Sequence, residues 1–262
     1  MVERLNSQQT LVSFLEKLHQ AQPRALLLDY DGTLAPFHIE REQAFPYPNV
    51  IKILETIIEA DHTRVVLVSG RWIKELIPLL GLKRLPEIWG CYGLEHLRAD
   101  GTYEIAHLDL PAMQGLIEAE NWLVKMGLAA YCEHKPGSLA LHWRGQPLDV
   151  IQTINDRLWR NLAIFIEQAD LRVDEFDGGI ELRIYKGDKG IVVRSILQEM
   201  GPSAVVAYLG DDLTDECAFK AIKDRGISIL VRPQLRPTSA DFWLKPPEEL
   251  LSFLKTWVEV TN

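Results

Sequence analysis

The stretch Ala25-Leu26-Leu27-Leu28-Asp29-Tyr30-Asp31-Gly32-Thr33-Leu34 decides the fold of this chain. Its apolar residues run directly into two aspartates and a Gly-Thr turn, which predicts a strand buried on both faces of a parallel sheet. Ligands of such sheets bind beyond the carboxyl ends of the strands, so Asp29 lies where a ligand is expected. The stretch therefore predicts an α/β fold with a functional site just after residue 28.

Asp29 and Asp31 place two carboxylates within three residues, and their charges repel each other. A hard divalent cation relieves this repulsion, and Mg²⁺ is the ion that best suits such oxygen ligands. An ionised Asp29 beside that ion can attack phosphorus as a nucleophile. Asp31 can then act as general acid for the leaving alcohol and as general base for water. The alternative is that both aspartates only begin a turn, as Asp-Gly often does.

Three later segments carry side chains that suit the same site. The apolar run at 64–68 ends in Ser69-Gly70-Arg71, where a hydroxyl and the free N–H groups of a helix start suit a phosphate oxygen, although a simple helix cap is the alternative. Arg71 is either a phosphate or substrate contact or a surface ion pair. Lys189 opens a helix, where a cation opposes the helix dipole, so an anion is expected nearby, with Lys186 as the second choice.

The fourth segment follows the apolar run at 204–209. Asp211, Asp212, Asp215 and Glu216 gather there at a strand end, and such a cluster is costly unless a cation offsets it. The alternative interpretation of this cluster is the N-terminus of a helix, where acidic residues are common. We expect the last core strand at 227–231 and a closing helix at 247–258. Arg232 and Arg236 are left without a role, as surface charges.

Composition limits the classes of function. The 262 residues are 47% hydrophobic and 25% charged, as in ordinary globular proteins, and the net charge of −9 argues against nucleic acid or an anionic membrane as partner. No apolar run approaches the roughly 18 residues of a membrane span, and the N-terminus has no signal-peptide pattern. Three scattered cysteines read as reduced thiols, so we expect a cytoplasmic protein, and a monomer.

Residues 108–184 differ in pattern from the rest of the chain. A helix and two short strands occur there twice, which predicts a small antiparallel α+β layer inserted into the parallel-sheet domain. Polar side chains alternate along these strands. A solvated sheet face is one interpretation, and a face that closes over a substrate is the other.

Together these motifs resemble the haloacid dehalogenase (HAD) phosphatases. Asp29 to Leu34 matches the first HAD motif, Ser69 the second, Lys189 the third and Gly210 to Glu216 the fourth. Leu28 to Pro36 is more narrowly similar to trehalose-6-phosphate phosphatases. The resemblance implies a doubly wound parallel-sheet HAD core (1–107 and 185–262) and an inserted type-2 cap for substrate specificity (108–184).

The resemblance also implies roles for residues. Asp29, the Asp31 carbonyl and Asp211 would bind Mg²⁺, with Asp215 in or beside the coordination shell, while Ser69 and Lys189 hold the transferring phosphoryl group. The cap positions that match the sugar-contact segments of the family are Glu133, Lys135, Ser138, His142, Arg144, Glu181 and Arg183, which join Gly70 and Arg71 as substrate-binding candidates.

The function implied is a phosphatase that acts on a sugar phosphate through an aspartyl-phosphate intermediate, with trehalose 6-phosphate as the first expectation. Departures from the family pattern at His134, Trp143 and Ile184-Tyr185 leave the exact sugar open. The alternatives are another glycosyl phosphate, such as glucosylglycerol phosphate or mannosyl-3-phosphoglycerate, and a sugar-phosphate sensor without turnover.

Overall fold

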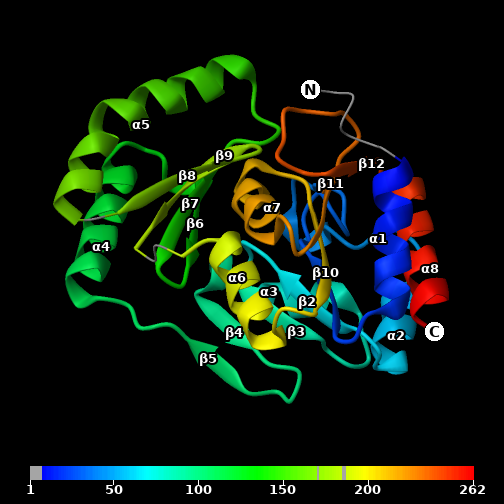
Figure 1. Ribbon diagram of the computed structural model, residues 1–262. Coiled ribbons are helices and arrows are strands. Elements are labelled where there is room, and N and C mark those ends of the chain that lie inside the picture. Colours follow the sequence, from blue (N-terminus) through cyan, green and yellow to red (C-terminus); the bar gives the residue numbers. More distant parts are fainter. Residues whose placement is uncertain (1–7, 170, 185–186) are drawn as a thin grey trace. The chain divides into compact units, whose positions relative to one another are not determined.

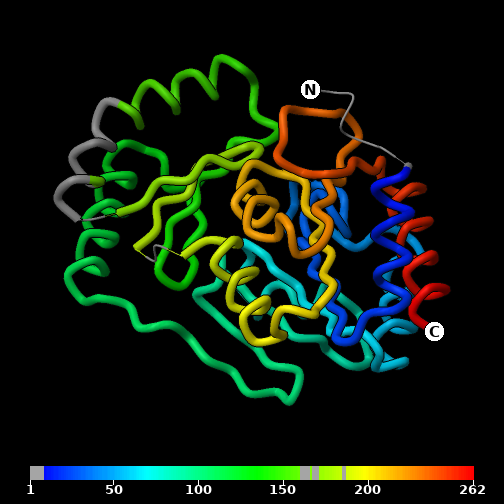
Figure 2. Tube along the Cα trace, in the orientation of Figure 1, coloured from blue at the N-terminus to red at the C-terminus, as the bar shows by residue number. Residues whose placement is uncertain are grey.

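The computed structural model describes residues 8–169, 171–184 and 187–262 (Figure 1). The chain forms two compact units. The larger contains the chain up to Glu104 together with Asp188–Asn262, and the smaller is Ile105–Gly187. The described residues of the smaller unit are green to yellow-green in the chain trace of Figure 2. Lys186, the second choice for the site lysine, lies outside the described residues.

An eight-stranded sheet is the centre of the larger unit. Its spatial order is β12-β11-β10-β1-β2-β3-β4-β5. Neighbouring strands from β12 to β3 are parallel, whereas β3 and β4 are antiparallel. The strands are β1 (Arg24–Leu28), β2 (Arg64–Val68), β3 (Glu87–Gly90), β4 (Glu95–Leu97), β5 (Tyr103–Ile105), β10 (Val205–Gly210), β11 (Gly226–Val231) and β12 (Phe242–Leu244).

Helices cover both faces of this sheet, so the fold is the predicted doubly wound α/β core. Alternate β1 side chains divide between two apolar clusters: Leu26 and Leu28 pack with one set of helices, and Ala25 and Leu27 with the other. The first set is α1 (Gln8–Gln20), α2 (Val50–Ala60), α3 (Ile73–Leu80) and α8 (Glu248–Thr261); the second is α6 (Lys189–Met200) and α7 (Glu216–Ile222). This double coverage explains the uninterrupted apolar run of β1.

Two sequence predictions about the end of the larger unit were wrong. Residues 227–231 are not the last core strand, because β12 adds a further parallel strand beside β11. With three residues, β12 is too short for its alternation to show in the sequence. Helix α8 also runs to Thr261, beyond the expected end at 258. Short 3₁₀ turns occur at Arg41–Gln43, Cys91–Gly93, Ala129–Tyr131 and Leu213–Asp215.

Strand register brings three of the four motifs of the larger unit to one edge of the sheet. Leu28 of β1 is paired with Leu209 on one side and with Leu67 on the other. The chain therefore leaves these three neighbouring strands at nearly the same level, just before Asp29, Asp211 and Ser69. A parallel sheet makes this convergence unavoidable, because all carboxyl ends lie at one edge.

The smaller unit is the expected α+β layer. Its antiparallel sheet has the order β6-β7-β9-β8, formed by Cys132–Lys135, Ser138–His142, Gly179–Arg183 and Arg172–Phe176. Helices α4 (Leu110–Lys125) and α5 (Leu148–Ala169) contribute to a core with Leu139, Leu141 and Leu182. Among the described residues, no helix is long and apolar enough to cross a membrane.

Phe253 and Phe45 test the core of the larger unit with one kind of substitution. Phe253 on α8 is 5% exposed and Phe45 is 52% exposed. We expect Phe253→Ala to lower the free energy of unfolding by about 3–5 kcal/mol, because it removes buried area and leaves a cavity. Phe45→Ala should change it by less than about 1 kcal/mol. Urea unfolding followed by fluorescence measures both, and equal losses would contradict this packing.

Candidate active site

Three buried carboxylates meet at the ends of β1 and β10. Asp29, Asp211 and Asp215 each place one carboxylate oxygen within 4.8 Å of those of the other two. Their residues are 4%, 1% and 0% exposed. Three like charges this close and this dry repel strongly, so the arrangement requires positive charge.

Lys189 supplies part of that charge from the first position of α6. Its ammonium nitrogen lies 2.8 Å from an oxygen of Asp29 and 2.8 Å from an oxygen of Asp215. Burial alone would lower the pKa of Lys189, but the two carboxylates raise it above the ordinary value, so the lysine stays charged. The anion that sequence predicted near this helix start is thus a pair of aspartates.

Asp215 is saturated by the protein itself. Besides Lys189, its oxygens accept hydrogen bonds from the Tyr208 hydroxyl at 2.6 Å and from the main-chain N–H groups of Asp211 and Asp212 at 3.2 and 3.0 Å. Asp215 therefore organises the loop after β10. This leaves Asp29 and Asp211 as the carboxylates with room for a ligand.

The chemistry of Asp211 fits a bound cation. Neither of its buried carboxylate oxygens has a hydrogen-bond partner among the described residues, and the buried Thr33 hydroxyl also lacks one. Burial, followed by the charges of Asp29 and Asp215, raises the pKa of Asp211 well above its usual range. Burial likewise raises the pKa of Asp29 to about 7, with Lys189 opposing. A buried carboxylate without a partner is costly, and a hard cation removes that cost.

Two glycines allow the loops to approach this closely. Gly32 has a φ of +79°, and a Cβ there would lie 2.1 Å from an Asp211 carboxylate oxygen. A Cβ at Gly210 would lie 2.4 Å from the Asp215 carboxyl carbon. Any larger residue at either position would push the acidic side chains apart.

Asp31 lies beside the cluster but is paired differently. Both of its oxygens accept hydrogen bonds from Arg71, at 2.7 Å each. The Arg71 side chain is 10% exposed, so this ion pair is largely buried rather than on the surface. The Ser69 hydroxyl oxygen, 3.1 Å from the Arg71 main-chain nitrogen, accepts a hydrogen bond from it, and Gly70 lies against the Tyr92 ring.

Sequence reasoning missed two arginines. Arg232 and Arg236, expected as surface charges, both reach the main-chain oxygen of Asp211, at 3.4 Å and at 3.2–3.3 Å. Their side chains are 25% and 14% exposed. Their position in the sequence could have indicated this contact. Both residues follow β11, which neighbours β10, so they lie at the same edge of the sheet as Asp211.

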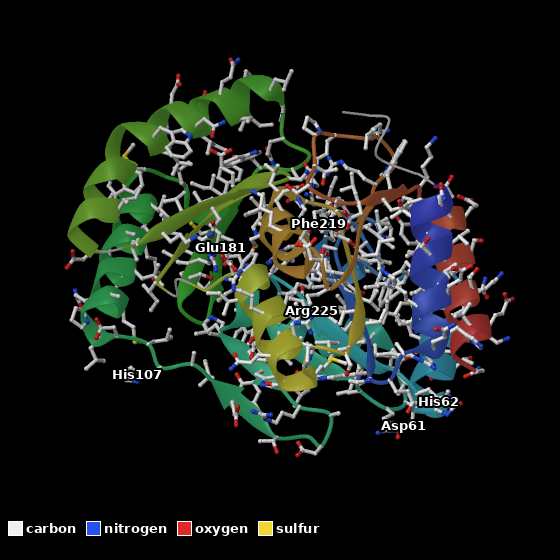
Figure 3. All side chains as sticks on the ribbon, viewed as in Figure 1. Asp61, His62, His107, Glu181, Phe219 and Arg225 are labelled. Atoms are coloured by element: carbon white, nitrogen blue, oxygen red, sulfur yellow. The ribbon has the colours of Figure 1, made fainter. Side chains whose placement is uncertain are left out.

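In the smaller unit, the expected substrate residues share one face of the sheet. Residues on β7 alternate: Leu139 and Leu141 point into the core between sheet and helices, whereas Ser138 and His142 point to the other side. Strand pairing then places the rest on the side of Ser138: Glu133, Lys135, Glu181 and Arg183. Figure 3 labels Glu181 on this sheet.

These polar side chains form pairs rather than a row of solvated charges. Glu181 accepts hydrogen bonds from Lys135 at 2.8 Å and from the Ser138 hydroxyl at 2.5 Å, and is fully buried. The His142 Nε2 atom lies 2.6 Å from Glu133 Oε2. Other contacts on this unit are Arg183 with Asp174 and the Gly187 carbonyl, and Arg144 with the Asp177 carbonyl. Buried charges persist only when paired in this way.

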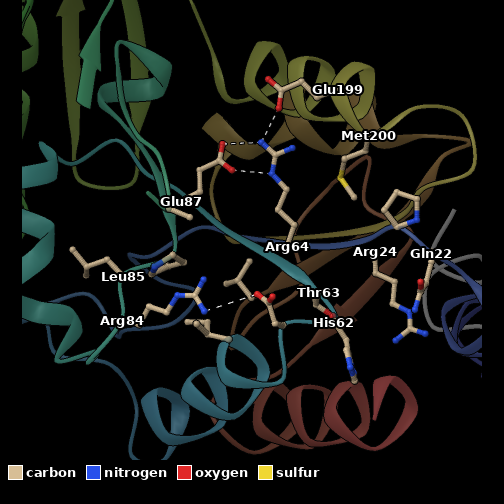
Figure 4. Close-up of a pocket in the computed structure, with 16 residues that line it drawn as sticks. Gln22, Arg24, His62, Thr63, Arg64, Arg84, Leu85, Glu87, Glu199 and Met200 are labelled. Atoms are coloured by element: carbon tan, nitrogen blue, oxygen red, sulfur yellow. Dashed lines mark hydrogen bonds and ion pairs between the residues drawn. The ribbon is translucent and has the colours of Figure 1, made fainter. Parts of the chain in front are cut away.

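A cavity of about 930 Å³ lies elsewhere, at the amino ends of β1, β2 and β3 (Figure 4). Its charged groups are already matched: Arg64 binds Glu87 at 2.8 and 3.1 Å and Glu199 at 2.7 Å. Although burial opposes it, hydrogen bonds from His96, Arg64 and Trp89 lower the pKa of Glu87 to about 2. We interpret this network of ion pairs as stabilising the fold.

The acidic cluster predicts a pH-dependent response to Mg²⁺. The folded metal-free protein holds a proton on Asp29 up to a pKa of about 7, whereas an unfolded aspartate releases it near 3.8. The stability that this proton supports is therefore lost as the pH rises from about 4 to 7, and Mg²⁺, which competes with protons, should stabilise more at higher pH. We expect the Tm increase caused by Mg²⁺ to grow from pH 5.5 to pH 8.

Asp211→Asn should abolish that increase. Because it also removes a buried carboxyl group within 4.8 Å of those of Asp29 and Asp215, it should raise the Tm of the metal-free protein at pH 8 by about 3 °C, as expected for roughly 1 kcal/mol. Asp61→Asn, at an exposed aspartate, is the control. Differential scanning fluorimetry in chelator and in Mg²⁺ measures both. A Mg²⁺ response that survives in Asp211→Asn would contradict this site.

Known proteins resemble this chain over most of its length. It is 30% identical to an uncharacterized glycosyl hydrolase of Mycobacterium tuberculosis over 92% of this chain but 19% of that protein, so it spans about a fifth of that relative. It is 27% identical to the probable trehalose-phosphate phosphatase H of Arabidopsis thaliana, covering 94% of this chain and 75% of that one.

Solved structures share the fold. The C-terminal domain of Candida albicans trehalose-6-phosphate phosphatase superposes with a TM-score of 0.78 at 21% identity, covering 95% of this chain and 96% of that one. A haloacid dehalogenase-like hydrolase of B. subtilis gives 0.62 at 13% identity, covering 88% and 98%. The model of the trehalose-phosphatase family matches residues 27–248, which include every motif of the larger unit and the whole smaller unit. The chain therefore belongs to the trehalose-phosphatase family.

Proposed function

We propose that this protein is a Mg²⁺-dependent phosphatase that hydrolyses a sugar phosphate, with trehalose 6-phosphate as its substrate. The observation that carries the proposal is the cluster of Asp29, Asp211 and Lys189 at the edge of the larger sheet. The membership of the chain in the trehalose-phosphatase family supports it. The relatives named as trehalose-phosphate phosphatases support the choice of sugar.

Asp29 is the nucleophile in this proposal. It attacks phosphorus and displaces the sugar alcohol, so that an aspartyl phosphate forms and the P–O bond to the sugar breaks. Asp29, the Asp31 main-chain carbonyl and Asp211 would hold Mg²⁺, which would supply positive charge for the transferring group. Lys189, 2.8 Å from Asp29, favours the ionised form of the nucleophile and faces the same group.

Asp31 moves the protons. It donates one to the departing sugar oxygen and later takes one from the water that hydrolyses the aspartyl phosphate. In the structure both Asp31 oxygens are bound by Arg71, so Asp31 must leave that guanidinium before it can donate a proton. The guanidinium of Arg71 and the Ser69 hydroxyl then become available to phosphate oxygens.

The smaller unit, Ile105–Gly187, supplies sugar recognition in this proposal, as the cap that the sequence predicts over residues 108–184. Sugar hydroxyls both donate and accept hydrogen bonds, and the face of its sheet offers both kinds of group: the carboxylates of Glu133 and Glu181, and the cations of Lys135 and Arg183. A site built to bind hydroxyls rejects analogues that lack them, because its polar groups would stay unpaired.

Phosphate release from a panel of sugar phosphates with Mg²⁺ tests the proposal. We expect selective release from trehalose 6-phosphate, and a loss of at least about 10³-fold in kcat for Asp29→Asn, because the amide is a poor nucleophile. Mutant-sensitive release from another glycosyl phosphate would keep the mechanism and change the substrate. Absence of release from every member of the panel would leave a sugar-phosphate sensor instead.

Glu181→Gln tests sugar recognition separately from phosphoryl transfer. The change removes the negative charge that Lys135 contacts at 2.8 Å, so we expect KM for trehalose 6-phosphate to rise at least about tenfold, which corresponds to about 1.4 kcal/mol. Hydrolysis of p-nitrophenyl phosphate should stay within about twofold. Glu118→Gln on the exposed side of α4 is the matched control. Equal losses on both substrates would refute the assigned role of this face.

A further inference from the structure

The connection from β11 to β12, orange in Figure 1, is fastened to the loop that carries Asp211. Arg236 donates hydrogen bonds from Nε and Nη2 to the main-chain oxygen of Asp211, at 3.3 and 3.2 Å, and from Nη2 to that of Asp212, at 2.7 Å. The guanidinium thus bridges two successive carbonyl groups at the start of the acidic loop.

Glu216, the first residue of α7, anchors the other end of the same arginine. Its carboxylate accepts a hydrogen bond from Arg236 Nη1 at 2.5 Å. It also accepts from the Thr238 hydroxyl and the Ser239 main-chain nitrogen, at 2.7 Å each. One arginine and one glutamate therefore tie three segments together: the acidic loop, the start of α7 and the connection to β12.

We infer that Arg236 is a positioning residue for the metal site: it fixes the main chain of Asp211 and so aims the Asp211 carboxylate at Asp29, without touching metal or substrate. The inference rests on the proposed function, because it gives the aimed carboxylate its purpose.

Asp211 needs such support for two reasons. Its strand has its last cross-strand partner at Gly210, paired with Leu230, so the sheet does not hold the carbonyls that follow. Its carboxylate also has no hydrogen-bond partner among the described residues and lies within 4.8 Å of the like-charged oxygens of Asp29 and Asp215. Repulsion would rotate a loosely held side chain away, and a fixed main chain prevents this.

The planar guanidinium is what this role requires. Arg236 uses all three nitrogens at once, in a fork that an ammonium cannot reproduce. Arg232 adds charge nearby, with Nη1 at 3.9 Å from an Asp211 carboxylate oxygen. Charge and geometry can therefore be separated by substitution at position 236.

Calorimetric titration of the full-length protein with Mg²⁺ alone, without substrate, tests the inference. We expect Arg236→Gln to weaken Mg²⁺ affinity about 10- to 100-fold, the range for residues that support metal ligands. Arg236→Lys should remain at least about fivefold weaker than wild type. KM for the sugar phosphate at saturating Mg²⁺ should stay within about twofold. Arg84→Lys and Arg84→Gln, at an exposed arginine beyond the opposite edge of the sheet, are the matched controls.

Each outcome decides the matter. Mg²⁺ affinity within twofold of wild type in Arg236→Gln would overturn the inference, and a wild-type affinity in Arg236→Lys would reduce Arg236 to a source of charge. Should Arg236→Gln fail to fold, Glu216→Gln removes the anchor alone, and we expect about three- to tenfold weaker Mg²⁺ binding. Wild-type protein that binds no Mg²⁺ would remove the proposed function too, whereas normal wild-type binding with unchanged variants would remove only the inference.

Discussion

The contact of Lys189 with Asp29 and Asp215 is the interaction on which the rest of the site depends. One buried lysine faces three buried carboxyl groups, so the acidic groups outnumber the positive charge in a region closed to solvent. Asp215 and Lys189 satisfy each other. Asp29 and Asp211 have less positive charge around them, which is why, under the proposed function, this edge of the sheet would accept a cation and a phosphoryl group.

The residues around the three carboxylates fix the positions of these groups rather than neutralise their charge. Tyr208, two main-chain N–H groups, and the clamp of Arg236 on the loop carbonyls all fix directions without neutralising Asp211. Glycine at positions 32 and 210 lets the loops close to the required distance. The stability given up at the cluster is offset by the two apolar layers on either side of the sheet.

Under the proposed function the two units divide the chemistry. The larger unit concentrates charge, which suits a phosphate, and the smaller unit presents paired polar groups such as Glu181 with Lys135, which suit hydroxyl groups. Pairing costs the smaller unit little when no sugar is bound, because each charge already has a partner. Asp31 and Arg71 are likewise paired within the larger unit, and under the proposed function this pair would open before catalysis.

The sequence by itself determined the doubly wound core and the inserted α+β layer, and it predicted that most residues of the candidate site lie at one edge of the sheet. These follow from local patterns: buried strands appear as apolar runs, and a parallel sheet carries whatever follows each strand to one edge. The tertiary structure alone decided which partner each charge takes. Arg71 pairs with Asp31, Asp215 binds Lys189 and Tyr208, and Arg236 donates hydrogen bonds to the main chain of Asp211. These contacts join different segments of the chain, and no local sequence pattern encodes the distances between them. Strand β12 was missed for the same reason: three residues carry no period, and their place beside β11 exists only once the sheet has formed.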